Sequence, residues 1–253
     1  YKVNYNLIYS NNNGGDGSAF DPYGGTSQSA WSSPVNIGNN TIIFNTSTSA
    51  TLLTFEPQQG DPEFTVNHNN IYSNTATYEI KNYRSSSKSD INAENNYWGT
   101  TNESEIQEMI YDWNDDASLG FLDYDPYLTA PSTLPPVSPP KNVVKQSTSG
   151  GVLLSWAANP EADVTGYKVY YGAYSGYSFA NSVDAGNVTS YTLSGASTSD
   201  TIAVTAYDPS ANGTDDQTDG FESWFSVADQ APQVSSVTST TANGSYNADD
   251  VIA

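Results

Sequence analysis

Short apolar segments flanked by asparagine recur four times in the first part of the chain. Each segment spans six residues, and their starts lie 34, 29 and 26 residues apart. The segments are Asn6–Asn11, Asn40–Asn45, Asn69–Asn74 and Asn95–Thr100. Repeats at such intervals are typical of solenoids, in which one repeat forms one coil and packs on the next. The pattern therefore predicts stacked coils that share one hydrophobic core.

The residues within the repeats predict how the coils align. We expect one column of inward-pointing side chains, formed by Ile8, Ile42, Ile71 and Tyr97. The asparagines fall at strand ends, where Asn tolerates left-handed backbone angles and where equivalent side chains can form hydrogen-bonded ladders between coils. Alternation of apolar and polar residues predicts the other strands of the coils. These are residues 50–55, 63–67, 78–82 and 90–94.

A helix is expected directly after the last repeat, over Glu103–Trp113. Its apolar residues are spaced to lie on one helix face. They are Ile106, Met109, Ile110 and Trp113. Asn102 or Thr101 can cap the N-terminus, and residues 120–128 then return as a strand. A solenoid needs such an element because an uncovered last coil exposes its core and its strand edge.

The repeat residues also carry a family resemblance. Asn69–Asn74 and the run Ile91–Thr100 resemble the last turns of right-handed parallel β-helix proteins of the pectate-lyase-like superfamily. The resemblance implies that residues 1–128 are the end of such a β-helix, with 103–128 as its helical cap. The segment Gly14–Pro34 is then an insertion rich in Gly and aromatic residues. It forms either a binding loop or a loop whose aromatic side chains pack back on the coils.

The pattern changes after a Pro-rich stretch at residues 129–140, which is typical of a semi-stiff linker. Short alternating strands separated by turn residues follow, and they predict a β-sandwich. The expected strands are residues 152–156, 166–171, 190–193, 201–207 and 223–227. The sequence thus predicts an all-β chain with two architectures joined by a linker.

The second half resembles fibronectin type III domains over residues 141–230. Leu154-Ser155-Trp156 and the run Gly166–Tyr170 carry the likeness, which implies that Trp156 is the core tryptophan. The chain departs from the family at Asp200, where a corner tyrosine is usual, so the hydrogen bond at that corner must be absent or replaced. Residues 231–253 resemble the opening strands of a bacterial Ig-like module. We therefore expect a fragment of a longer protein.

Charge and composition narrow the function classes. The chain has 28 acidic and 7 basic residues, a net charge of −21 and no cysteine. Such a chain repels phosphate backbones and anionic lipid, which argues against nucleic-acid and membrane-surface roles. No apolar run is long enough to span a bilayer, and no signal peptide is present in the first residues. These features favour a soluble segment of a secreted or cell-surface bacterial protein.

Candidate catalytic residues are sparse. Lyases of the resembled superfamily need a basic residue to abstract a proton, and Lys81 and Arg84 are weak candidates for this role in an otherwise solvated loop. Glycoside hydrolysis needs two facing carboxylates, and no spacing in the chain selects a pair. The single histidine, His68, lies at an expected turn of the solenoid and is interpreted as structural.

A metal site is the stronger prediction. One acidic segment between two expected strands places oxygen ligands around a Gly turn, as calcium prefers, although its spacing is not that of an EF-hand. The candidate ligands are Asp208, Asn212, Asp215, Asp216, Asp219 and Glu222. The alternative is an acidic, solvated loop.

These observations support three hypotheses. The leading one is a non-catalytic segment that acts in adhesion, carbohydrate binding or spacing, with a carbohydrate or a cell-surface protein as partner. The second is an extracellular polysaccharide lyase or hydrolase whose active coils lie upstream. The third is a structural subunit of an extracellular filament or sheath that self-associates.

Overall fold

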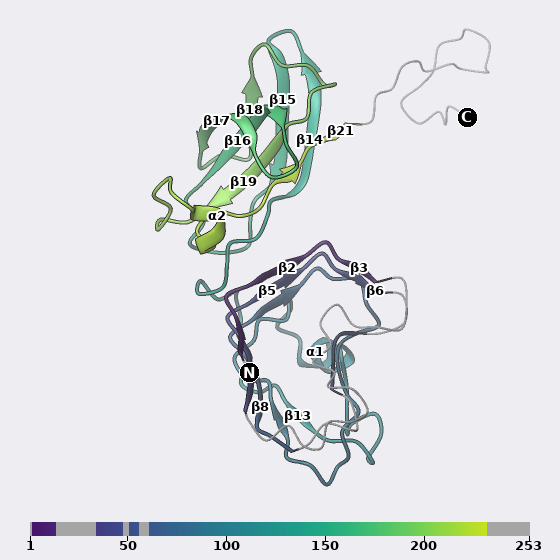
Figure 1. Cartoon of the computed structure of the whole chain (residues 1–253). Helices are drawn as coiled ribbons and strands as arrows, with labels where there is room; N and C mark the ends of the chain where they lie inside the picture. The colour runs from purple at the N-terminus through teal and green to yellow at the C-terminus, as the bar shows by residue number, and fades with distance from the viewer. Residues whose placement is uncertain (1, 14–33, 48–50, 56–60, 232–253) are drawn as a thin grey trace, which may run out of the picture.

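The computed structural model describes residues 2–13, 34–47, 51–55 and 61–231 (Figure 1). Most of the insertion expected at 14–34, and the Ig-like segment expected at 231–253 apart from its first residue, fall outside these ranges. The described chain is all-β apart from two short helices, and it consists of coils of parallel strands followed by two packed sheets. None of its helices is long and apolar enough to cross a membrane.

The first half is a parallel β-solenoid of about three turns. One sheet joins β1 (Lys2–Asn4), β4 (Val35–Gly38), β8 (Phe64–Asn67), β11 (Ile91–Asn92) and β13 (Leu122–Asp123). A second joins β2 (Leu7–Tyr9), β5 (Thr41–Ile43) and β9 (Asn70–Tyr72). A third joins β7 (Thr51–Phe55), β10 (Tyr78–Asn82) and β12 (Ile110–Tyr111), and β3 (Asn12–Asn13) pairs with β6 (Thr46–Ser47). The predicted coil architecture is confirmed.

The predicted core column is correct for three coils and wrong for the fourth. Ile8 pairs with Ile42, and Ile42 pairs with Ile71. Tyr97, however, bridges Asn70 rather than Ile71, so Trp98 takes the inward position and is 1% exposed. The doublet Asn95-Asn96 offers two alignments, and the sequence does not distinguish them. The structure selects Asn96 because its side chain bonds to Asn69 in the coil above.

Two asparagine ladders run along the stack, as predicted. In the first, each side-chain amide donates to the next side-chain oxygen at 2.9–3.0 Å, through Asn6, Asn40, Asn69 and Asn96. The same oxygens accept the backbone N–H of the preceding ladder residue at 2.9 Å. The second ladder consists of Asn11, Asn45 and Asn74. Asn40, Asn45, Asn69 and Asn96 are fully buried, so the ladders satisfy polar groups that would otherwise lack a hydrogen-bond partner.

The left-handed backbone angles belong to the residues just before the ladder asparagines. They are Tyr5, Asn39, His68 and Asn95 at one corner, and Ser10, Phe44 and Ser73 at the other. This refines the expectation that the flanking asparagines themselves take these angles. His68 has φ 58°, which agrees with its interpretation as a turn residue.

The predicted helix is shorter than expected. Helix α1 spans Glu103–Glu108, and the Asn102 side chain caps it by accepting from the N–H of Ser104. The chain then leaves the helix because Ile110–Tyr111 pairs with β10 and the carbonyl of Met109 accepts from Glu79 and Ile80. Trp113 is 50% exposed, so its predicted place on the buried helix face is wrong.

The second half contains two four-stranded sheets around one core. The first sheet joins β18 (Ser190–Leu193), β15 (Gly151–Ala157), β14 (Lys141–Thr148) and β21 (Asp229–Gln230). The other joins β17 (Phe179–Gly186), β16 (Gly166–Tyr174), β19 (Ala203–Tyr207) and β20 (Ser226–Val227), with α2 (Asp216–Asp219) in the connection before β20. Neighbours are antiparallel except for β14 and β21. Trp156 lies in this core against Tyr167, at a ring distance of 5.3 Å.

Asp200, at the position where the resembled family usually has a corner tyrosine, takes part in two hydrogen bonds. The Asp200 carboxylate accepts from the N–H of Ser197 at 2.8 Å, and its carbonyl accepts from the Lys145 ammonium at 2.6 Å.

The Pro-rich stretch is packed onto the solenoid rather than extended through solvent. Ser132 exchanges two hydrogen bonds with the side chain of Asn70, and the Thr41 hydroxyl donates to the carbonyl of Pro136 at 2.6 Å. Ile43 on the outer side of β5 is fully buried. The two halves consequently meet over the β2–β5–β9 sheet (Figure 1).

Candidate functional site

A cleft of about 460 Å³ lies where the solenoid, the Pro-rich stretch and the two-sheet unit meet; we call it the junction cleft. Its solenoid side is formed by Phe44, Tyr72, Ser73, Tyr97, Trp98, Gly99, Thr100, Glu105 and Met109. Its other side is formed by Ser138, Pro139, Lys141, Ala158, Asn159 and Pro160. A volume of this size lies within the range of small-ligand sites, roughly 300–1,000 Å³.

Aromatic side chains line the solenoid side because β9 and the segment around Tyr97, which bridges it, alternate inward and outward positions. Ile71 and Trp98 point into the core, so the neighbouring Tyr72 and Tyr97 lie outside it, with their rings 5.8 Å apart. Gly99 leaves room beside them: it has φ +80°, and an added Cβ would lie 2.8 Å from the Cβ of Tyr72. The cleft thus has an aromatic wall whose position depends on the coil register.

Polar groups border this wall. The Lys141 ammonium donates to the Ser73 hydroxyl at 2.6 Å and lies 4.7 Å from the centre of the Phe44 ring. Burial lowers the pKa of Lys141 below its usual value. Opposite, the Glu105 carboxylate accepts from the Thr100 hydroxyl at 2.5 Å. The cleft therefore offers one cation, one carboxylate and several hydroxyl and amide groups beside its aromatic rings.

Glu161 lies behind the cleft and bonds to two residues that line it, Tyr72 and Ser138. Its carboxylate accepts from the Tyr72 hydroxyl at 3.1 Å and from the N–H of Ser138 at 3.0 Å, and it is only 6% exposed. Burial and the neighbouring Glu161 charge raise the pKa of Tyr72 above its usual value. Asn159 donates to the Ser138 carbonyl at 2.6 Å. These bonds join the last coils to the two-sheet unit, so the two sides of the cleft are held at a fixed separation.

The two weak catalytic candidates, Arg84 and Lys81, lie in different environments. Arg84 is 1% exposed, pairs with Asp61 at 2.6 Å and lies 4.7 Å from the Phe64 ring, so the expectation that it sits in a solvated loop is wrong. Burial lowers the pKa of Arg84, which Asp61 partly opposes. This position indicates a structural role for Arg84.

Lys81 lies instead on the outer face of β10. Its ammonium is 5.3–5.9 Å from the ring centres of Tyr78, Tyr83 and Tyr111. Such contacts between a cation and aromatic faces are favourable. The arrangement forms a half-buried aromatic patch around one lysine. No local sequence pattern predicts this patch, because the three tyrosines come from two coils.

The predicted calcium ligands do not converge on one point. Within the described ranges, no group of three or more His, Cys, Asp or Glu residues is arranged to hold a metal ion. Asp215 and Asp219 are exposed, and the Asp208 carboxylate accepts from the N–H of Ser210 at 2.7 Å. Asn212 is also exposed, and its side-chain oxygen accepts from Thr214 at 2.9 Å. Calcium binding stays a prediction that this arrangement does not favour.

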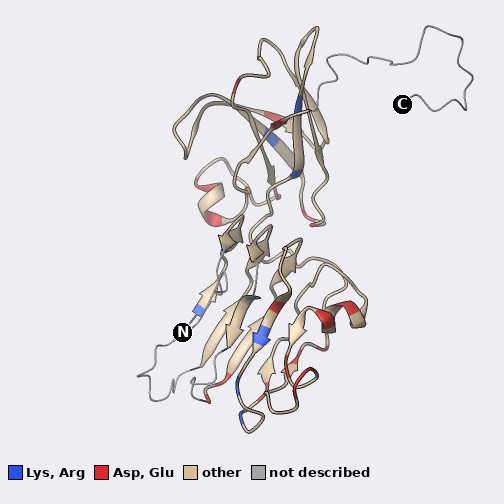
Figure 2. Ribbon diagram, turned by 90° about the vertical axis from the view of Figure 1, so that its right-hand side faces the viewer, with Lys and Arg blue, Asp and Glu red and all other residues tan. Residues whose placement is uncertain are grey.

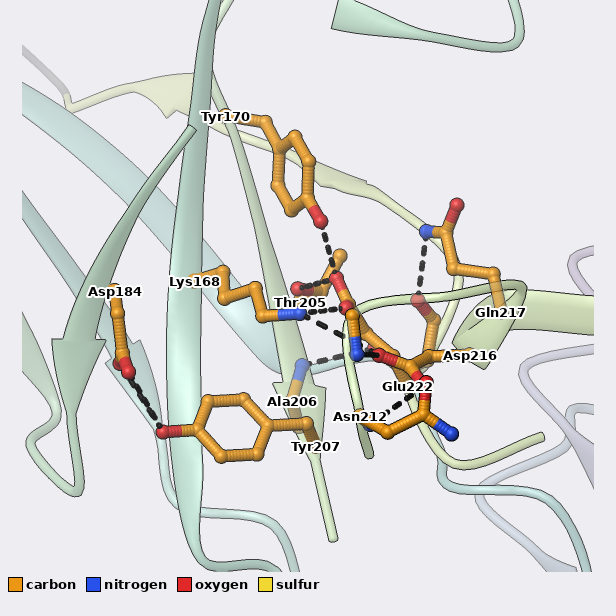
Figure 3. A network of polar contacts seen from close by, with 12 residues as sticks. Lys168, Tyr170, Asp184, Thr205, Ala206, Tyr207, Asn212, Asp216, Gln217 and Glu222 are labelled. Carbon is orange, nitrogen blue, oxygen red and sulfur yellow. Dashed lines mark hydrogen bonds and ion pairs between the residues drawn. The ribbon is translucent and has the colours of Figure 1, made fainter. Parts of the chain in front are cut away.

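The two remaining candidates, Asp216 and Glu222, are instead buried around a lysine (Figure 3). Lys168 contacts the Glu222 carboxylate and lies 3.8 Å from Asp216. The Tyr170 and Thr205 hydroxyls donate to the other Glu222 oxygen, at 2.6 and 2.7 Å. Sequence reasoning identified these acids but missed their partner, because Lys168 lies 54 residues before Glu222.

Lys and Arg occur in both halves of the described chain, whereas Asp and Glu are more numerous, as Figure 2 shows. Lys141 is the one Lys or Arg among the residues that line the cleft. Comparison of the chain with protein-family models, with curated proteins and with solved structures finds no match.

Proposed function

We propose that the chain is a non-catalytic part of a secreted or cell-surface protein, and that it binds a carbohydrate in the junction cleft. One observation carries the proposal: aromatic rings, hydroxyls and one ammonium converge in a cleft of saccharide size. The apolar C–H face of a sugar ring packs on an aromatic ring, and its hydroxyls both donate and accept hydrogen bonds. Tyr97, Lys141 and Glu105 supply these complementary groups.

The arrangement of the elements supports the rest of the proposal. Coils with asparagine ladders suit the end of a right-handed β-helix of the pectate-lyase-like superfamily, with α1 and β13 as its cap. The second unit suits a fibronectin type III domain, because its sheets follow the orders β18-β15-β14 and β17-β16-β19-β20 around Trp156. A solenoid packed against such a unit presents the cleft on a rigid support, which favours adhesion or spacing over a flexible tether.

Binding of immobilised and soluble glycans to the purified chain tests the proposal. We expect binding of at least one neutral or acidic glycan and a loss of roughly tenfold or more in affinity for Tyr97→Ala, because burying a ring contact contributes on the order of 1–3 kcal/mol. Tyr97 is half-buried, so circular dichroism and melting temperature must show that the variant is folded.

Tyr111→Ala is the matched control, since it removes a half-buried tyrosine from the Lys81 patch on the same solenoid. Loss of binding in Tyr111→Ala with retention in Tyr97→Ala would place the ligand on the patch and contradict the cleft assignment. Release of unsaturated sugar products from a polyuronide by the chain would contradict the non-catalytic role.

A further inference from the structure

Lys168 extends from β16 toward two carboxylates that are almost fully buried. Its ammonium contacts Oε2 of Glu222 and lies 3.8 Å from Oδ2 of Asp216. The side chains of Glu222 and Asp216 are 3% and 4% exposed. Burying charges requires good geometry and additional hydrogen bonds to offset the loss of hydration. Here one ammonium serves two acids, so the site combines a nucleophilic nitrogen, an acyl group and a second carboxylate.

The two oxygens of Glu222 have different environments, as Figure 3 shows. Oε2 faces the lysine, whereas Oε1 accepts from the Tyr170 hydroxyl at 2.6 Å and the Thr205 hydroxyl at 2.7 Å. Two fixed donors on one oxygen are what stabilise negative charge when a nucleophile adds to an acyl carbon. The carboxyl group is therefore held with Cδ beside the amine and with one oxygen in an oxyanion hole.

Asp216 is held as the second acid by the backbone. Its two oxygens accept the N–H groups of Asn212 and Gly213, both at 2.8 Å. These donors fix the carboxylate with Oδ2 3.8 Å from the lysine nitrogen. An approach of less than about 1 Å, or one bridging water, brings it within reach to act as a proton carrier. The geometry resembles that of an acyl transfer site whose substrate groups both belong to the protein.

We infer that Lys168 and Glu222 condense to an intramolecular amide cross-link, with Asp216 as the proton carrier. Proton transfer within the ion pair gives the amine and the carboxylic acid, and the nitrogen attacks Cδ while Tyr170 and Thr205 stabilise Oε1. Asp216 takes a proton from nitrogen and delivers it to Oε2, which leaves as water. The products are one amide, one water and the unchanged Asp216 carboxylate, so no co-reactant is required.

The cross-link would join β16 to the segment directly before β20, across 54 residues of chain. That segment also holds the Pro-rich stretch, because Gly220 accepts from the N–H of Val137. A covalent closure of this kind restricts the unfolded chain in the way that a disulfide does, and the chain contains no cysteine.

Intact mass spectrometry of the purified chain under denaturing conditions tests the inference. We expect a mass lower than that of the sequence by one water molecule, and a branched peptide after proteolysis that joins Lys168 to Glu222. A mass equal to that of the sequence would overturn the cross-link and leave an ordinary buried ion pair.

Variants separate this reaction from other dehydrations. Lys168→Arg keeps the positive charge, and Asp216→Asn removes the proton carrier; both should have the full mass. Glu222→Gln should form the same amide with loss of ammonia. Lys145→Arg is the control, because Lys145 is also buried but donates to the carbonyl of Asp200, and it should retain the loss of water. Loss of water in Lys168→Arg would place the reaction elsewhere and overturn the inference.

Discussion

Glu79 is the residue whose charge state the fold changes most clearly. It lies on β10 at the end of the second asparagine ladder, is 8% exposed and accepts from the Asn74 amide at 3.3 Å. Burial raises the pKa of its carboxyl group to about 8, and the bond from Asn74 opposes this only in part. Glu79 is therefore neutral in the folded protein at a pH where the unfolded chain carries its charge.

This difference predicts a pH-dependent stability. Below pH 4.5 the Glu79 carboxyl group is protonated in both the folded and the unfolded state. Between pH 4.5 and about 8 it is ionised only in the unfolded state, so the free energy of unfolding falls as the pH rises. Above about pH 8 both states are ionised and the free energy of unfolding no longer changes with this group. The loss is on the order of a few kcal/mol. Glu79→Gln should abolish this part of the profile and melt higher than the parent at pH 8, whereas the exposed Glu108→Gln should not. Parallel thermal-melting profiles for the parent and Glu79→Gln would contradict the assignment.

At the scale of the elements, the corners of the solenoid matter as much as its strands. The strands have only two to five residues each, too few to fix a register by side-chain packing alone. The ladder asparagines supply the missing specificity: Asn40 and Asn69, for example, each bond to the equivalent residue of the next coil and to a backbone carbonyl of the previous coil. A left-handed residue before each ladder position turns the chain into this geometry.

Asn69 is the ladder position to test, since it is fully buried between two neighbours. Asn69→Ala removes the acceptor of Asn40 and the donor to the Ile37 carbonyl and to Asn96. Each buried polar group that is left without a hydrogen-bond partner costs about 1–3 kcal/mol, so we expect a loss of roughly 3 kcal/mol or more in unfolding free energy. Urea unfolding followed by the fluorescence of tryptophan, including buried Trp98, measures it.

Asn92→Ala is the matched control for this prediction. Asn92 is exposed, and its side-chain oxygen accepts only a local bond from the N–H of Glu94 at 3.2 Å. Its loss should cost less than about 1 kcal/mol. Similar losses for the two variants would argue that the ladders contribute no more than ordinary surface contacts.

At the scale of the whole molecule, the junction determines how the two halves act together. Ile43 and Tyr72 are buried outside the solenoid core, and Glu161 bonds to both sides of the interface. The Pro-rich stretch lies against β5 and β9, and its second part, residues 135–140, is buried except for half-buried Pro136. The two halves are thus a single rigid support for the cleft rather than independent modules on a tether.

Glu161→Ala is expected to loosen this junction, because it removes the acceptor of the Tyr72 hydroxyl and of the N–H of Ser138. Each buried donor left without an acceptor costs about 1–3 kcal/mol of stability. Small-angle scattering should then give a larger radius of gyration, and calorimetry should separate the melting of the halves. The exposed Asp229→Ala serves as control and should leave both unchanged. An unaltered scattering profile for Glu161→Ala would show that the other contacts, among them the hydrogen bonds of Ser132 and Lys141, hold the junction without Glu161.

Much of the fold could be predicted because its signals are local. The repeat spacing, the asparagines at strand ends, the expected strand at Tyr78–Asn82 and the cap at Asn102 all depend on residues close in sequence, and the structure agrees with each. The early end of α1 was not predictable in this way. Its last residues are drawn into the sheet by β10, which belongs to the previous coil.

The sequence by itself determined the coil repeat, the ladders and the all-β character, because periodicity and turn chemistry act within a few residues. Only the tertiary structure decided that Trp98 rather than Tyr97 enters the core, that Arg84 is buried, and that Lys168 meets Glu222. It also decided that strands, a turn and the Pro-rich stretch enclose the cleft. Each of these depends on contacts between distant segments, whose energies are set by packing and burial.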